Sequence, residues 1–289
     1  MGFRNRKNEA GQAVLIVLLS LSVVLVIVLY IMSRSISDIS LSSKDQDSMR
    51  AFSAAEAGVE KALVGLFAVG SSSGVTTIGD ATFNASVTSF GSGQNQLVYP
   101  LALKSGDQAI FWFNRTGDPI SFTGNQFKLC WGASGTSNAL PDTPAILLTI
   151  YYRTTLGRYR VARVTLDPNA ARAVNNRFSS ASTICTVATE NFQFQSTINL
   201  GAGGLNIPSY GTAGVLQFAT ARFLYNTTTG HKIGVDSSAT PALFPSQGIK
   251  VDSQGTSADA NRRIEVYQLN SEVPPIFANA IYSTSDIIK

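Results

Sequence analysis

The feature that most constrains this chain is an uncharged, largely apolar run near its N-terminus. Residues 13–32 contain no Asp, Glu, Lys or Arg, and as a helix they would span about 30 Å at 1.5 Å per residue. This length matches the hydrocarbon core of a bilayer, so the run predicts one membrane-spanning helix. Arg4, Arg6 and Lys7 precede it against a single acid, Glu9, which favours a cytoplasmic N-terminus and places the rest of the chain outside the cytoplasm.

An ordinary secretory signal peptide is the first alternative for this run. Such peptides have apolar cores of about 7–15 residues, followed by a small-x-small cleavage site. The run in this chain is longer, and the sequence Met32-Ser-Arg-Ser35 that follows it is a poor peptidase site. The sequence therefore favours a membrane helix over a cleaved secretory signal.

A helical pattern continues past the membrane run to Gly70 without a proline, since the first proline is Pro100. Apolar residues recur at spacings of three, four and seven, which is typical of one helical stripe. Four of them are expected to pack the helix: Phe52, Val59, Leu63 and Leu66. The pattern predicts a transmembrane and assembly helix over 12–69, about 85 Å long if it is uninterrupted. The polar stretch 42–48 breaks the stripe, so the alternative is a membrane anchor followed by a separate helix packed on a domain.

Two segments of this region resemble a known family. The basic leader ending in Gly11, followed by Gln12-Ala-Val-Leu-Ile-Val-Leu-Leu, resembles the class III signal of type IV pilins and pseudopilins. The segment 50–63, RAFSAAEAGVEKAL, is similar to the AF-x-AAEAG-x-x-x-AL pattern of PilX-type minor pilins. The resemblance covers residues 1–68. It implies a leader at 1–11, cleavage after Gly11 by a prepilin peptidase, and N-methylation of Gln12.

The sequence departs from the major pilins at two points. Most of them carry glutamate at the fifth residue after the cleavage point, where this chain has Ile16. That carboxylate pairs with the terminal ammonium of a neighbouring subunit inside an apolar filament core, where an unpaired charge is costly. Many major pilins also place a helix-breaking proline near the outer edge of the membrane, and this segment has none. Both departures favour a minor pilin, incorporated rarely or at a place such as the filament tip.

Beyond Gly70 the composition changes to short apolar runs separated by Gly, Pro and Asn. This pattern over residues 75–289 predicts a β-rich, sandwich-like head. Nine runs are expected as strands: 82–90, 97–103, 109–114, 127–131, 145–152, 159–166, 192–198, 215–225 and 263–269. The head is either one domain or two subdomains divided near 167–182, where 170–173 forms a short helix or an exposed linker. The predicted fold class is α+β, with a long N-terminal helix before the head.

Two cysteines, Cys130 and Cys185, fall in the predicted head. In an oxidising compartment an even pair usually forms a disulfide. The alternative is two buried free thiols, because the strand around Cys130 is apolar enough to hold its thiol in a core. The sequence favours the disulfide, and two free thiols remain the alternative.

Residues that would support catalysis are scarce. His231 is the single histidine and is expected in an exposed turn. No His pair or Cys cluster has the spacing of a zinc site, and no phosphate loop or nucleophile elbow occurs in the sequence. We therefore expect no catalytic residue, no metal and no cofactor.

Nucleic acid is not expected as a partner. The net charge is +4 and only 14% of the residues are charged, so surface polarity comes mostly from Ser, Thr, Asn and Gln. No cluster of basic residues is interleaved with aromatics along a face. The basic residues nearest to such a cluster are Arg153, Arg158, Arg160 and Arg163.

Aromatic residues offer a second candidate surface. If exposed, five of them could form a platform for sugars, although in strands of this kind such residues are expected in the core. These are Tyr99, Phe111, Trp112, Phe113 and Trp131.

These features together predict a structural subunit of a type IV pilus or related filament, either a minor pilin or a pseudopilin. Its expected partners are other pilin subunits through the N-terminal helix, the prepilin peptidase, and the inner membrane before assembly. The head is expected outside the cytoplasm and, after assembly, on an extracellular filament. The alternative is an unprocessed, single-pass anchored surface protein whose β domain binds a glycan or a protein.

Overall fold

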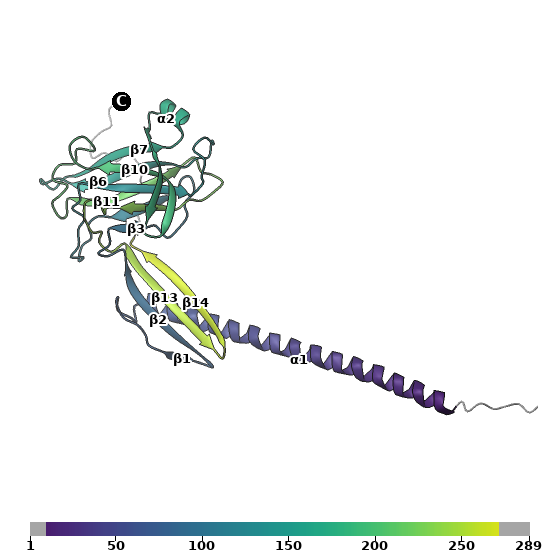
Figure 1. Ribbon diagram of the computed structural model, residues 1–289. Coiled ribbons are helices and arrows are strands. Elements are labelled where there is room, and N and C mark those ends of the chain that lie inside the picture. Colours follow the sequence, from purple (N-terminus) through teal and green to yellow (C-terminus); the bar gives the residue numbers. More distant parts are fainter. Residues whose placement is uncertain (1–9, 272–289) are drawn as a thin grey trace, which may run out of the picture. The chain divides into compact units, whose positions relative to one another are not determined.

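A computed structural model describes residues 10–271 and confirms the α+β fold, with one long N-terminal helix followed by a β-rich region (Figure 1). Contacts divide the chain into two compact units. The helix unit contains residues 10–67, 72–86 and 252–264, and the sandwich unit contains residues 68–71, 87–251 and 265–271. The stretch 167–182, considered above as a possible division of the head, lies within the sandwich unit.

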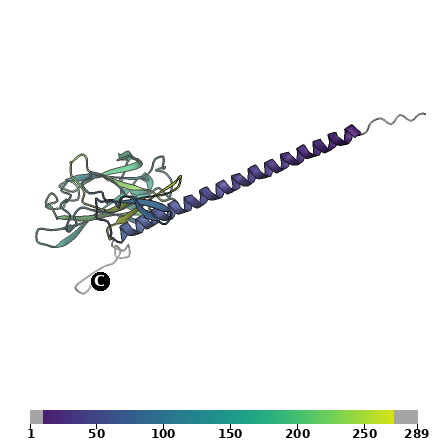
Figure 2. The ribbon, with the colours of Figure 1, turned by 90° about the horizontal axis from the view of Figure 1, so that it is seen from below.

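Helix α1 (Ala10–Leu63) is a single element of 54 residues, about 80 Å long at 1.5 Å per residue (Figure 2). The polar stretch 42–48 does not interrupt it. It ends at Leu63, a few residues before the expected boundary, because Gly65 adopts a φ of 83° that favours glycine. The Gly65 N–H donates to the Ala62 carbonyl and the Leu66 N–H to the Lys61 carbonyl, which is the hydrogen-bond pattern of a Schellman motif.

One sheet has four strands in the order β1-β2-β13-β14 and contains the strands of the helix unit. Their bounds are β1 (Thr76–Ile78), β2 (Ala81–Phe90), β13 (Gly248–Ser257) and β14 (Ala260–Leu269). Residues from the first and the last third of the chain therefore share one sheet. The two-residue connection between β13 and β14 fits a tight hairpin, and Ala258 in it has a positive φ of 48°.

Two five-stranded sheets build the sandwich unit. The first has the order β3-β12-β5-β10-β9, and the second β4-β11-β6-β7-β8. Neighbouring strands in these two sheets pair antiparallel, except that β7 and β8 pair parallel. The bounds of the first sheet are β3 (Gln96–Val98), β5 (Gln126–Ala133), β9 (Ser182–Val187), β10 (Glu190–Asn199) and β12 (Ile233–Asp236). Those of the second are β4 (Gln108–Trp112), β6 (Ala145–Arg153), β7 (Tyr159–Asp167), β8 (Ser179–Ser180) and β11 (Leu216–Leu224).

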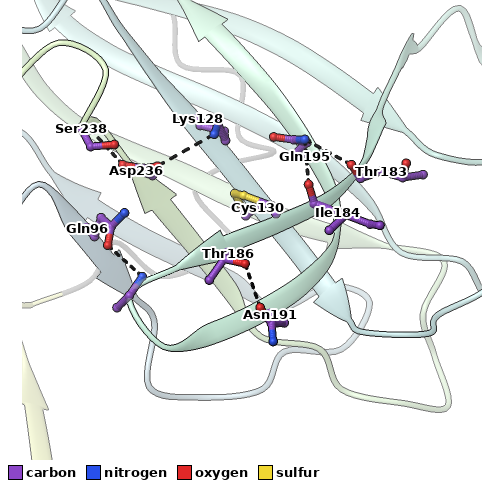
Figure 3. Close-up of a disulfide and its surroundings, with 12 residues drawn as sticks. Gln96, Lys128, Cys130, Thr183, Ile184, Thr186, Asn191, Gln195, Asp236 and Ser238 are labelled. Atoms are coloured by element: carbon purple, nitrogen blue, oxygen red, sulfur yellow. Dashed lines mark hydrogen bonds and ion pairs between the residues drawn. A yellow bond between two sulfur atoms is a disulfide. The ribbon is translucent and has the colours of Figure 1, made fainter.

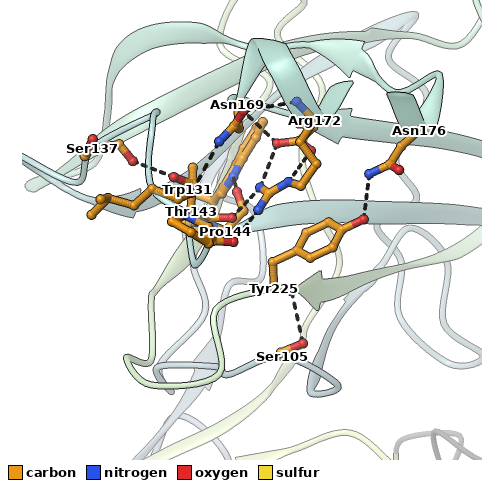
Figure 4. Close-up of polar contacts among 12 residues, drawn as sticks. Ser105, Trp131, Ser137, Thr143, Pro144, Asn169, Arg172, Asn176 and Tyr225 are labelled. Carbon is orange, nitrogen blue, oxygen red and sulfur yellow. Dashed lines mark hydrogen bonds and ion pairs between the residues drawn. The ribbon is translucent and has the colours of Figure 1, made fainter. Parts of the chain in front are cut away.

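One apolar core lies between these two sheets and takes side chains from both. Trp131 on β5 is fully buried in it, and its indole N–H donates to the Pro144 carbonyl at 2.9 Å (Figure 4). A buried indole needs such a partner. Aromatic rings fill much of the core around it: Tyr99, Phe111, Phe113, Phe122, Phe127, Phe194, Phe223 and Phe244. The β-rich, sandwich-like head predicted from short apolar runs separated by Gly, Pro and Asn is thus confirmed.

The short helix α2 (Ala170–Asn176) occupies the stretch for which a helix or a linker was expected. Asn169 caps it by accepting a hydrogen bond from the Arg172 N–H. The Arg172 guanidinium donates to both carboxylate oxygens of Asp167, at 2.7 and 2.8 Å (Figure 4). It also donates to the Pro141 and Thr143 carbonyls. Asp167 is the last residue of β7 and is fully buried. The network therefore attaches α2 to the end of that strand.

A disulfide joins Cys130 on β5 to Cys185 on β9 (Figure 3), with the two Cα atoms 5.9 Å apart. It lies in a small separate core with Val187 and Phe192. The Gln195 side-chain amide donates to the Thr183 and Ile184 carbonyls of β9. The bridge links residues 55 positions apart. A crosslink over such a long loop lowers the conformational entropy of the unfolded chain and so stabilises the folded one.

Candidate functional site

The apolar run 13–32 of α1 is exposed throughout in the part of the chain that the structure describes. Within residues 10–271 it is the one helix long and apolar enough to cross a membrane, and none of its 18-residue apolar window is buried. The hydroxyls of Ser20 and Ser22 donate to the Val17 and Leu19 carbonyls within the helix, so these side chains are satisfied without water. Such a surface requires lipid or other protein around it.

The predicted processing site is only partly within the described residues. Gly11 and Gln12 lie in the first turn of the α1 backbone, whereas residues 1–9 of the predicted leader lie outside the described part of the chain. Ile16 follows in the helix with its side chain 65% exposed. Cleavage after Gly11 therefore stays a prediction.

The C-terminal part of α1 packs on the four-stranded sheet through small residues. Its buried positions recur at spacings of three and four and form one face: Ala51, Ala54, Ala55, Gly58, Val59 and Ala62. Of the four residues expected to pack, only Val59 belongs to this face. Phe52, Leu63 and Leu66 are 46%, 38% and 66% exposed. The large side chains were the stronger signal in the sequence, but the close approach of helix and sheet admits only small ones.

Two glycines show how close this approach is. A Cβ atom at Gly255 on β13 would collide with the Ala51 carbonyl oxygen and lie 2.6 Å from the Ala55 nitrogen. A Cβ at Gly58 on the helix would meet the Ser253 hydroxyl and lie 2.8 Å from the Phe83 ring. Helix backbone and strand backbone are therefore in direct contact. This packing explains the small residues Ala54, Ala55 and Gly58 of the Ala-Ala-Glu-Ala-Gly sequence.

Polar contacts surround the small-residue face. The Arg262 guanidinium on β14 donates to the Ser48 hydroxyl at 2.6 and 2.9 Å. The Lys61 ammonium lies 5.0 Å from the centre of the Phe83 ring, within range of a cation–π interaction. The helix is thus fixed at both ends of its packed segment.

The other face of the same segment is open to solvent and mixes apolar residues with polar ones, including Glu56 and Glu60. Met49, Phe52, Leu63, Val64 and Leu66 are all exposed. Scattered exposed apolar residues are ordinary, but these follow a helix whose preceding 20 apolar positions also bury nothing. Exposed apolar residues thus occur both in the run 13–32 and near the C-terminal end of α1, separated by the polar stretch 42–48, which makes the apolar run the candidate assembly surface.

The five aromatics considered as a sugar platform do not form one. Tyr99, Phe111, Phe113 and Trp131 lie in the core of the sandwich. Trp112 alone lies on the opposite face of its sheet and is half-buried. It has other aromatic neighbours there, described below.

His231 is buried, and not in an exposed turn as expected. Its backbone pairs with Leu103 and its Nδ1 accepts a hydrogen bond from the Ala133 N–H at 3.2 Å. Burial lowers the pKa of His231 below its usual value of 6.5, and the negative charge of Asp142 offsets part of that shift. These contacts give it a structural role. Within residues 10–271 no three His, Cys, Asp or Glu side chains gather to hold a metal ion.

Comparison of the chain with protein-family models, curated proteins and solved structures finds no match. The site is therefore interpreted from its own residues and geometry.

Proposed function

We propose that this chain is a minor pilin or pseudopilin-like subunit of a type IV filament. The observation that carries the proposal is the 54-residue helix: its apolar run 13–32 is not buried by any of the described residues, while its C-terminal end packs on a β-sheet. A helix of this kind can lie in a bilayer and can pack against identical or related helices without refolding. The resemblance of residues 1–68 to the pilin leader and the PilX-type pattern supports the same function.

Processing would give the helix its assembly-competent end. Cleavage after Gly11 removes the basic leader, and N-methylation then modifies the amine of Gln12. The new terminus begins directly at the apolar run, so the helix can leave the membrane without carrying the charges of Arg4, Arg6 and Lys7 into a filament core.

Ile16 decides where such a subunit would sit. An isoleucine cannot neutralise the terminal ammonium of a neighbour, so each contact that needs that ion pair would leave a charge buried without a partner. A position at the filament tip, where fewer neighbours are met, avoids this cost. The disulfide between Cys130 and Cys185 supports an oxidising compartment for the head.

The test is the mass of the mature N-terminus in the natural host, measured separately in the membrane fraction and in filaments sheared from the cell surface. A species that begins at methylated Gln12 and is present in the sheared fraction is expected. A Gly11→Val variant serves as the control, because it removes the small residue at the cleavage point and should leave the leader in place. An unprocessed chain found only in membranes would refute the proposal.

The alternative is an unprocessed, single-pass anchored surface protein. Ile16 favours it in one respect, because an anchor has no need of the assembly carboxylate. An Ile16→Glu variant separates the two functions. In a filament subunit the new carboxylate should raise the amount incorporated or move the subunit along the filament, whereas in a simple anchor it would only weaken membrane retention.

A further inference from the structure

The outward face of the sheet β4-β11-β6-β7 carries a row of aromatic side chains. The register aligns Trp112, Phe218, Tyr151 and Val161 across the four strands. Ring centres of Phe218 and Tyr151 are 4.4 Å apart, and those of Trp112 and Phe218 are 5.2 Å apart. The residues next to them in sequence, including Phe111, Ala219 and Ile150, point into the core. The aromatic row is therefore additional to the core and lies on the opposite side of the sheet.

This row forms one wall of a cleft of about 630 Å³. Tyr159 and Val161 of β7 line it together with the aromatic row, and Arg160 and Gln217 add polar groups. Tyr159 is 71% exposed. The volume falls in the range of small-molecule sites, about 300–1,000 Å³, and the lining has the usual mixture of apolar surface and a few polar groups.

A smaller, polar hollow of about 210 Å³ adjoins the cleft, and Tyr151 lines both. Besides Tyr151, the hollow is lined by Gln108, Leu147, Thr149, Arg163, Thr220 and Arg222, most of which have polar side chains. Thr149 is the cross-strand partner of both Thr220 and Arg163, so these groups share one row directly beside the aromatic row. An apolar subsite and a hydrogen-bonding subsite therefore lie next to each other on the same face.

The charge of this region has a single sign. The β6–β7 hairpin contains Arg153, Arg158, Arg160 and Arg163, and no acidic residue occurs between 145 and 166. Within residues 10–271 none of these four arginines forms an ion pair with a carboxylate. The nearest acid in sequence, Asp167, is already occupied by Arg172. Uncompensated guanidinium groups beside a cleft select an anionic ligand, since Arg pairs with carboxylate and sulfate through two parallel hydrogen bonds.

We infer that this face binds an acidic oligosaccharide, whose rings contact the aromatic row while its hydroxyl and anionic groups bind the polar hollow. The carboxylate or sulfate of one sugar would pair with Arg163, and neighbouring hydroxyls would bond the Thr149 and Thr220 side chains. The inference goes beyond filament assembly and holds equally for an anchored or a filament-borne head, because every residue used lies in the sandwich unit.

The geometry favours a sugar over single-stranded nucleic acid. Base stacking needs open, flat ring faces. The rings of Phe218 and Tyr151 are stacked on each other with 21° between their planes, so each closes one face of the other. A pyranose needs only apolar contact for its C–H groups, together with donors and acceptors for its hydroxyls. The threonine hydroxyls and the glutamine amide supply these groups.

Binding is measured by calorimetry on the full chain in detergent micelles. Oligosaccharides of alginate present carboxylates, those of heparin present sulfates, and dextran of matched length is the neutral probe. We expect alginate or heparin oligosaccharides to bind and dextran not to bind. Which of the two acidic probes binds more tightly identifies the anionic group. Failure of both acidic probes, or equal binding of dextran, would overturn the inference.

Variants locate the site on this face. Arg163→Gln and Tyr159→Ala should each weaken binding about tenfold or more, the factor expected for losing a charged hydrogen bond or a large ring contact. Arg115→Gln and Leu156→Ala alter exposed residues outside the two hollows and serve as matched controls. Equal affinity in all four variants would overturn the inference. A third outcome is that the protein binds no acidic sugar but binds oligothymidylate tightly, and that Arg163→Gln and Tyr159→Ala abolish this binding. That outcome would identify the ligand as nucleic acid and overturn the inference. Unchanged melting temperatures verify that each variant is folded.

Discussion

Replacing Gly255 with alanine is the most direct test of the helix–sheet packing. The added Cβ would meet the Ala51 carbonyl oxygen and the Ala55 nitrogen, and both are backbone atoms of α1. Backbone atoms cannot rotate away, so the helix must move off the sheet. Overpacking of this kind costs about 1–3 kcal/mol, and the upper end applies because no side chain can yield. Removing a glycine from a strand returns about 0.5–1 kcal/mol, which leaves a net loss of about 2 kcal/mol.

Hydrogen exchange of the α1 amides at 51–62 measures this loss locally, in the full chain held in detergent micelles. A loss of about 2 kcal/mol raises the exchange rate of these amides about thirtyfold if they exchange by opening of the helix from the sheet. Gly211→Ala is the matched control, because its Cβ would approach no closer than 3.8 Å to the Thr123 carbonyl oxygen. Wild-type protection of 51–62 in the Gly255→Ala variant would refute the close packing described here.

Gly58→Ala gives a contrasting result at the same interface. Its Cβ would meet the Ser253 hydroxyl and the Phe83 ring, which are side-chain atoms able to shift. Alanine also raises helix propensity by about 1 kcal/mol, so the net loss should be smaller than in Gly255→Ala. Among residues 10–271 the buried Ser253 hydroxyl has no hydrogen-bond partner. Ser253→Ala should therefore be neutral or stabilising by about 1 kcal/mol, and should relieve Gly58→Ala when the two are combined.

Three further perturbations test the sandwich unit. Replacing both Cys130 and Cys185 with serine should cost about 4 kcal/mol by the loop-entropy estimate, seen as a lower urea midpoint than in the oxidised wild type; equal midpoints would contradict it. Arg172→Met should cost about 3–5 kcal/mol, because it leaves Asp167 buried without its partner; a melting temperature within a degree of wild type would argue against this. Because burial lowers the pKa of His231, the unfolded state binds more protons, so stability from this group is full above pH 6.5 and falls as the pH drops through the lowered value. His231→Gln should flatten the dependence of melting temperature on pH between about 5 and 7. An unchanged slope would show that other groups cause this pH dependence.

Much of the fold could be predicted from the sequence because its signals were strong and local. The charge-free run and the proline-free pattern predicted α1, and each of the nine apolar runs overlaps a strand. Strands β1, β8, β9, β12 and β13 were missed. Their sequences are short or rich in polar residues and glycine, and they are strands because neighbouring strands pair with them.

The packing residues of α1 were harder to predict for a different reason. Hydrophobic periodicity gives weight to large side chains, and Phe52, Leu63 and Leu66 follow that periodicity although they face outward. The buried face consists of four alanines, Gly58 and the expected Val59. The small residues are needed because the strand backbone comes so close, and Gly255, on that strand, lies about 200 residues away in sequence. The row of Trp112, Phe218 and Tyr151 was invisible for the same reason, since its members come from three different strands.

The small-residue face also bears on how the resemblance to pilins should be used. The Ala-Ala-Glu-Ala-Gly pattern is part of that resemblance, yet in this chain its small residues are accounted for by contact with the chain's own sheet. Any protein that holds a helix this closely against a strand would need a similar pattern, so the pattern alone carries little information about filaments. Residues 13–50 are different, because almost none of the described residues covers them. The case for assembly therefore depends on the membrane half of α1 and on Gly11, which is why the mature N-terminus decides it.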